Sequence, residues 1–368
     1  MVAFDFDTVR FFVRWSDFEP HTGTIDAAML DRFDTVLALA DDMGLRALPS
    51  LVGGYMGGAV RDLYRGAVLD AQLRLVRMLA ERASTHASLA AFDLAHEFSK
   101  LSLPAQVRVS AGEHSTEPAA APLVADWSRR LSEAIRTASR APITATVASE
   151  DLTRERFYRL ASLAMPFGFI SLNASNLTAA FGRSKLDPEV IPFLASLAAA
   201  FSYKPVLLTG FGNPTCPPEK FSAFDRFAAE DERPNATISP DDTAFATYPC
   251  CTEGENAAWC ASVLERLQQD GRLGALWWCW SDFSADVLKG LPDALPDHER
   301  ANGILRADGS EKPVASVLSR FARERRAVVR AADMPMIATT YYYRTLPTAT
   351  KTLFDAFLGF VAERRARL

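Results

Sequence analysis

The chain has 368 residues, of which 49% are apolar, and a formal net charge of −5. A slightly acidic chain is a poor match for the polyanionic backbone of nucleic acids, so no nucleic-acid partner is expected. No apolar run approaches the roughly 20 residues that span a bilayer, and the first residues lack the order of a signal peptide. The sequence therefore predicts no membrane partner and, as written, a cytoplasmic protein; it does not predict an oligomeric state.

Short apolar, β-branched or aromatic runs alternate along the chain with longer amphipathic stretches. The runs predict strands at 8–15, 45–52, 89–95, 142–148, 167–173, 204–210 and 274–280. Helical periodicity fills the intervals at 27–44, 69–82, 123–139, 187–201 and 255–271. Strands that are apolar throughout, each followed by a helix, indicate a parallel sheet covered by helices.

Seven such units predict an α/β fold of the (β/α)8 TIM-barrel type that lacks the first βα unit. A doubly wound sheet is the competing architecture, but no GxGxxG follows the first strand and no GxxxxGK[ST] occurs. Residues 1–320 are predicted to form the barrel. Residues 321–368 are predicted to form a C-terminal extension of helix and strand. One hypothesis is that a strand from MPMIATTYYYRTLP (334–347) fills the gap left by the first strand, and the alternative is an extension that merely packs on the barrel.

The five cysteines, all in the C-terminal half, have no zinc-type spacing, so neither a metal nor another cofactor is expected. Reduced thiols are the expected state for a chain without an export signal, with one disulfide as the alternative. Long polar loops are predicted at 105–122 and 213–253.

The predicted strands end in a polar and aromatic set. Its members are Trp15, Asp17, Glu97, Asn173, Gly210, Trp280 and Asp282. In barrels the carboxyl ends of the strands build the active face. Five segments in order, VRFFVRWSDFEP (9–20), FDLAHE (92–97), KPVLLTGFGNPT (204–215), GALWWCWSDF (274–283) and HERANGILRADGSEKP (298–313), resemble clan A glycoside hydrolases, particularly the cellulases and β-mannanases of family 5.

The resemblance assigns roles to several residues. Glu97 matches the acid/base, whose pKa burial raises so that it can deliver a proton near neutral pH. Arg10 matches an arginine that hydrogen-bonds the nucleophile carboxylate; a structural ion pair is its alternative role. His96 replaces the usual asparagine before the acid/base, and either contacts a sugar or has a structural role. Trp278 matches the tryptophan that stacks beneath the sugar, and Trp15, Trp280 and Asp282 lie near the same mouth.

Four departures from the family pattern occur at this site. Gly210 stands at the nucleophile position, where glycine offers no side chain to attack an anomeric carbon. Asn173 and Asn176 replace a His-x-Tyr type pair, Tyr55 occupies a loop that usually carries His and Trp, and the first βα unit is absent. A retaining glycosidase needs two carboxyl groups about 5 to 5.5 Å apart.

The sequence therefore predicts a family 5-like protein for β-linked glucan or mannan oligosaccharides, catalytically impaired because Gly210 replaces the nucleophile. One alternative is a non-catalytic carbohydrate-binding or purely structural homologue. Another is an active hydrolase that uses a substitute carboxylate from Asp17, Glu19, Glu253, Glu255 or Asp282. Glu253 and Glu255 are by default read as acids at a helix N-terminus. An incomplete gene product is a further reading of the missing first unit.

Overall fold

The computed structural model describes residues 1–21, 23–53, 63–101, 118, 120–176, 179–216, 250–289, 300–324, 326–327, 334 and 338–366. Its strands form one seven-stranded parallel sheet in chain order. They are β1 (Thr8–Arg14), β2 (Arg46–Gly53), β3 (Phe92–His96), β4 (Ile143–Ala148), β5 (Ile170–Asn173), β6 (Val206–Phe211) and β7 (Ala275–Trp277). The predicted α/β, TIM-barrel-like architecture is confirmed.

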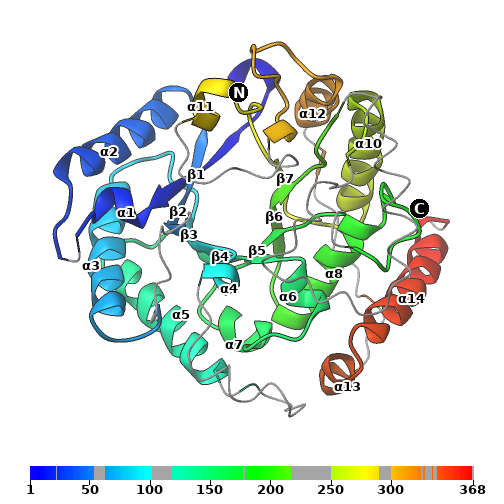
Figure 1. Ribbon diagram of the computed structural model, residues 1–368, viewed down its shortest axis with the longest axis horizontal. Coiled ribbons are helices and arrows are strands. Elements are labelled where there is room, and N and C mark those ends of the chain that lie inside the picture. The colour runs from blue at the N-terminus through cyan, green and yellow to red at the C-terminus, as the bar shows by residue number, and fades with distance from the viewer. Residues whose placement is uncertain are drawn as a thin grey trace.

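Helices surround the curled sheet as an outer ring (Figure 1). After each strand in turn come α2 (Ala27–Asp42), α3 (Gly66–Ala83), α5 (Ala121–Arg136), α7 (Leu160–Ala164), α8 (Val190–Ser202), α10 (Glu253–Gln269) and α12 (Pro313–Glu324). The shorter elements are η1 (Val2–Phe4), α1 (Trp15–Phe18), α4 (Phe98–Leu101), α6 (Glu150–Thr153) and α11 (Ala285–Lys289). The chain closes with α13 (Thr339–Arg344) and α14 (Thr348–Arg365).

The strands are where the apolar runs predicted them, with small differences at their ends. β3 begins at Phe92 because the preceding Leu89 makes only an isolated bridge to Ala47. β7 is shorter than predicted because Cys279 and Trp280 leave the sheet and hydrogen-bond to Asn302 and Leu305 instead. The inward faces of β3 and β4 are polar in part, which places hydrogen-bonding groups inside the barrel.

The outer edges of β1 and β7 face one another across a gap that we call the seam. Within the described residues, β1 pairs only with β2 and β7 pairs only with β6. A cavity of about 760 Å³ lies along the seam and is lined in part by Leu48, Leu207, Leu276 and Leu318. Barrel interiors are normally filled by side chains, so the cavity marks a poorly packed part of the described core.

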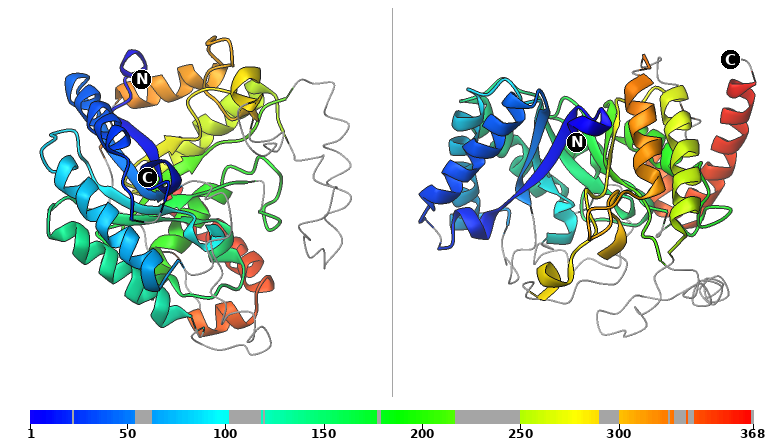
Figure 2. Two further views of the ribbon diagram at one scale, coloured as in Figure 1. Left: turned by 60° about the vertical axis from the view of Figure 1, so that its left-hand side comes forward. Right: turned by 90° about the horizontal axis from the view of Figure 1, so that it is seen from above.

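The C-terminal segment does not form the predicted strand. Residues 339–344 of that stretch are helical, and Ile337 lies outside the described residues. The hydroxyl of Tyr342 donates to the carbonyl of Leu152, and the ring of Phe354 packs on Phe193 of α8. The extension thus lies on the outside of the barrel (Figure 2), with α14 beside α8 and away from β1 (Figure 1), because its aromatic residues find an apolar surface there. The domain division at residue 320 stays a prediction.

Two of the cysteines are joined, which corrects the expectation of reduced thiols. Cys216 and Cys250 form a disulfide, and the neighbouring backbone is paired, since Cys216 N–H donates to the carbonyl of Cys251. Burial raises the pKa of the Cys251 thiol to about 12, with Glu255 adding to the effect. Most of the predicted loops at 105–122 and 213–253, together with Tyr55, lie outside the described residues, and α5 begins at Ala121 within the first of them.

Candidate active site

Glu97 follows β3 directly and has an unusual backbone conformation. Its φ is +46°, in the left-handed region that non-glycine residues seldom adopt. Its N–H donates to the carbonyl of Thr146, so the pairing with β4 holds this geometry. The side chain is 14% exposed. Strained backbone persists where the surrounding structure enforces it and is concentrated at functional sites, so Glu97 is the first candidate for a working carboxylate.

Asn173, at the end of β5, orients that carboxylate. Its Nδ2 donates to Glu97 Oε1 over 2.8 Å. The strand register places Asn173 opposite Gly210 of β6. A Cβ built on Gly210 would overlap Asn173 Oδ1 and lie 3.1 Å from Asn173 Cγ. One asparagine thus contacts the predicted acid and fills the space of the predicted nucleophile.

Arg10 is held inside the barrel by a carboxylate that the sequence interpretation did not single out. Its Nη2 lies 2.5 Å from Asp93 Oδ2, and both side chains are almost fully buried. Asp93 also accepts from the N–H and Oγ1 of Thr146 at 3.0 and 2.9 Å. The two charges of this buried pair neutralise each other, and the additional hydrogen bonds offset the cost of burying the carboxylate. The observed partner of Arg10 is therefore Asp93, which fits the structural role for Arg10.

His96 lies between Arg10 and Glu97. Arg10 Nη2 approaches His96 Nδ1 to 3.1 Å, and because a guanidinium only donates, Nδ1 accepts. The ring proton is then on Nε2, which lies 3.9 Å from Glu97 Oε2. His96 thus presents an N–H on the side of the acid, where the family's asparagine would present an amide.

Trp278 follows β7 and forms an aromatic wall of the same region. Its ring stacks on His96 at a centroid distance of 6.1 Å and meets Phe12 edge-on at 5.7 Å. The backbone N–H of Trp278 donates to the carbonyl of Phe211. Gly212 has φ +146°, and a Cβ there would meet the Trp277 ring at 3.0 Å, so a glycine is needed for the β6 loop to pass the tryptophans.

The other predicted sugar contacts lie in different surroundings. Trp15 is buried and donates from Nε1 to Glu19 over 2.7 Å. Trp280 is 37% exposed and meets Phe4 edge-on. Asp282 lies 2.8 Å from the ammonium of Lys312. Their proposed contact with a sugar stays a prediction.

The proposed substitute carboxylates are all engaged elsewhere. Glu253 begins α10 and pairs with Arg306 at 2.5 Å. Glu255 forms a capping box with Thr252, which agrees with its reading as an acid at a helix N-terminus and lowers its pKa. Asp17 pairs with Arg14, and Glu19 with Arg74.

Solved structures share this architecture, whereas no protein-family model and no curated protein matches the chain. The GH5_18 protein of Streptomyces cattleya, crystallised as a variant with Manβ1-4GlcNAc, aligns with a TM-score of 0.73 and 18% identity. The alignment covers 98% of this chain and 84% of that one. The fold is that of a GH5-like glycoside hydrolase.

Two further solved structures are similar. The GH5_18 protein of Bifidobacterium longum subsp. longum, also crystallised with Manβ1-4GlcNAc, has a TM-score of 0.66 and 17% identity over 90% of this chain and 72% of its own. The exo-β-1,4-mannosidase Op5Man5 of Opitutaceae bacterium strain TAV5 has a TM-score of 0.64 and 23% identity. This chain covers 54% of that mannosidase, and 88% of this chain is aligned.

Sequence reasoning missed several charged residues that support this face of the GH5-like barrel. Asp93 lies four residues before Glu97 on an apolar strand, and a charge in such a strand signals a partner inside the barrel. Asp151 accepts from Ser99 Oγ at 2.7 Å and from Ala148 N–H at 2.9 Å, which ties the loops after β3 and β4 together. Burial raises the pKa of Asp151 against the effect of Arg156.

Among the described residues, no group of three or more His, Cys, Asp or Glu side chains is arranged to hold a metal ion. None of the helices described in the structure combines the length and apolar character needed to cross a bilayer.

Proposed function

We propose that the protein binds β-linked mannosyl or glucosyl oligosaccharides at the carboxyl ends of its strands and does not cleave them at the rate of a glycosidase. The observation that carries the proposal is the packing of Asn173 over Gly210. The predicted acid, Glu97, is retained and oriented, while the place of the second carboxylate is filled by an amide. Losing one member of a catalytic carboxylate pair costs orders of magnitude in rate.

The retained groups suit a sugar. The C–H faces of a pyranose pack on an indole such as Trp278, and Glu97 with the Nε2 proton of His96 offers an acceptor and a donor for hydroxyl groups. The two GH5_18 structures were crystallised with Manβ1-4GlcNAc, so a mannosyl disaccharide is the ligand to test first. The active-hydrolase alternative is disfavoured by the engagement of Asp17, Glu19, Glu253, Glu255 and Asp282 with other partners.

Isothermal titration calorimetry with Manβ1-4GlcNAc, β-1,4-mannobiose and cellobiose tests the proposal. We expect saturable binding of at least one of them, weakened at least tenfold by Trp278→Ala and by Glu97→Gln. Tyr341→Ala is the control, because Tyr341 is 60% exposed on α13 in the C-terminal extension outside the barrel. If the parent chain binds none of these sugars, the purely structural alternative is favoured.

A further inference from the structure

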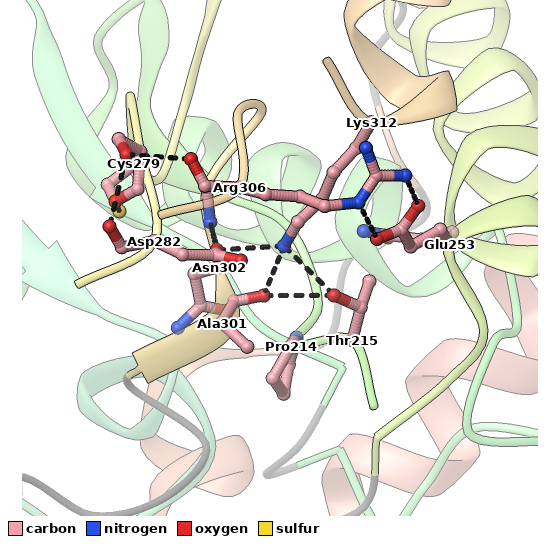
Figure 3. Close-up of polar contacts among 12 residues, drawn as sticks. Pro214, Thr215, Glu253, Cys279, Asp282, Ala301, Asn302, Arg306 and Lys312 are labelled. Atoms are coloured by element: carbon pink, nitrogen blue, oxygen red, sulfur yellow. Dashed lines mark hydrogen bonds and ion pairs between the residues drawn. The ribbon is translucent and has the colours of Figure 1, made fainter. Parts of the chain in front are cut away.

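Lys312 is a buried lysine whose ammonium group has a full set of acceptors. Its side chain is 2% exposed. Nζ donates to Asp282 Oδ1 at 2.8 Å, to Thr215 Oγ1 at 2.9 Å and to the carbonyl of Ala301 at 3.0 Å. Figure 3 shows these three contacts converging on the ammonium group. Three protons meet three acceptors, which offsets the cost of removing the charge from water.

The three acceptors come from three separate segments of the chain. Thr215 belongs to the loop after β6, the strand that carries Gly210. Asp282 belongs to the loop after β7, four residues beyond Trp278. Ala301 belongs to the segment that backs this second loop, where the backbone N–H of Cys279 donates to the carbonyl of Asn302. Lys312 therefore fastens the loops of β6 and β7 to one support, and its acceptor Asp282 follows Trp278 on the same loop.

The contacts around Asp282 leave this loop little freedom. Asp282 Oδ1 also accepts from Gly303 N–H at 2.8 Å, and a Cβ on Gly303 would overlap the backbone of Ser281 and Asp282. Arg306 pairs with Glu253, the first residue of α10, through two hydrogen bonds (Figure 3). Lys312 and its acceptors thus have close backbone packing on one side and helix α10 on the other.

We propose that Lys312 is a positioning residue for sugar recognition, which sets the orientation of the Trp278 ring relative to Glu97 by holding Asp282 and Thr215. The proposal rests on the proposed function, because it names a residue that shapes the same sugar site without contacting the sugar. Removing the ammonium leaves the Asp282 carboxylate, which is only 15% exposed, without its cation, and the loop after β7 then shifts to solvate it.

The test has one readout that needs no sugar. The chain is labelled with 5-fluorotryptophan, and the six fluorine resonances, one for each tryptophan, are recorded by NMR, with that of Trp278 assigned from Trp278→Phe. We expect Lys312→Met to shift or broaden the Trp278 resonance while the resonances of Trp127 and Trp15 stay in place. An unchanged Trp278 resonance in Lys312→Met overturns the proposal, whether or not the parent chain binds sugar.

The second readout is the dissociation constant for Manβ1-4GlcNAc. We expect Lys312→Met and Asp282→Asn each to weaken binding about tenfold, and the double variant to be no weaker than the poorer single variant, because the two residues act as one unit. Lys312→Arg should recover part of the affinity. A lower melting temperature with unchanged affinity and unchanged fluorine spectrum would assign Lys312 a purely structural role.

Two further variants complete the design. Lys351→Met removes an exposed lysine that pairs with Asp355 on α14, and it should change neither readout. If Lys312→Met does not fold, Thr215→Val removes only one of the three acceptors, and it should move the Trp278 resonance in the same direction by a smaller amount. No binding of sugar by the parent together with a shifted Trp278 resonance would refute the proposed function and keep the positioning role.

Discussion

Asn173 lies over Gly210, so the residue that orients the predicted acid also occupies the volume in which a nucleophile would stand. The same side chain donates to Glu97 through Nδ2 and faces the Gly210 Cα with Oδ1. The two positions are neighbours in the register of β5 and β6. Gly210 is therefore matched in shape by Asn173, which also contacts the Glu97 carboxylate.

The first prediction concerns this packing. Gly210→Ala introduces a Cβ that overlaps Asn173, and overpacking of this kind costs about 1–3 kcal/mol of unfolding free energy. Asn173→Ala should remove most of that penalty in the double variant. Gly254→Ala is the control, because a Cβ there meets nothing within 4 Å. Urea unfolding is measured for the parent, both single variants, the double variant and the control, and additive effects of the two changes on the free energy of unfolding would contradict the packing.

The second prediction concerns rebuilding the carboxylate pair. Gly210→Glu alone should remain inactive on an aryl β-mannoside, because Asn173 blocks the new side chain. The double variant Gly210→Glu, Asn173→Ala gives the carboxylate room, and we expect it to be the more active of the two in release of the aryl group. Equal activity of the single and double variants would show that Asn173 moves aside without cost.

The third prediction concerns the seam cavity. Leu207 lines the cavity, whereas Leu208, the next residue of β6, is fully buried on the opposite side of the strand. Leu207→Phe should raise the free energy of unfolding by about 0.5–1 kcal/mol by filling space. Leu208→Phe should lower it by about 1–3 kcal/mol by overpacking. Thermal unfolding measures the stability of both variants. A similar loss of unfolding free energy in both would mean that the cavity is not available to a larger side chain.

The fourth prediction concerns thiol reactivity. Burial raises the pKa of Cys251 to about 12 and that of Cys260 further, so both stay protonated and shielded at pH 8. Cys279 is half-buried and should be the cysteine that iodoacetamide modifies in the folded protein. Peptide mass spectrometry after labelling, with a sample unfolded in guanidinium as the control, gives the answer. Modification of Cys260 at the rate of Cys279 would contradict the structure.

The fifth prediction concerns the disulfide. Cys216 and Cys250 are 34 residues apart, and closing a loop of that length stabilises a fold by about 4 kcal/mol in the chain-entropy account. The Cys216→Ser, Cys250→Ser variant should lose about that much free energy of unfolding. Dithiothreitol should lower the stability of the parent but not that of the variant. Equal sensitivity of both proteins to dithiothreitol would exclude the disulfide as its cause.

The barrel was predictable because continuous apolar runs and helical periodicity are local signals. Val206–Phe211 and Ile143–Ala148 read as buried strands from the sequence alone, and each was confirmed close to its expected bounds. The hypothesis of a strand within 334–347 was wrong. Tyr341, Tyr342 and Tyr343 favour a strand locally, whereas this part of the chain packs on α8 as a helix.

The site was predictable only in part, because its contacts join residues far apart in sequence. Glu97 and Trp278 could be located from their places at strand ends, and the structure brings both next to His96. The pairing of Arg10 with Asp93 and of Asn173 with Gly210 depends on strand register and side-chain direction, which a single sequence does not give. Lys312 has no local signal, since its three acceptors lie 11 to 97 residues away.

The central claim, that the protein binds a β-linked sugar without cleaving it, is tested most directly by hydrolysis. Release of mannose from Manβ1-4GlcNAc by the purified parent chain is measured beside the Glu97→Gln variant, at sugar concentrations that saturate the calorimetric binding curve. We predict that both proteins release mannose only at the background rate. Turnover by the parent that Glu97→Gln abolishes would contradict the account and show that a second carboxylate completes the site.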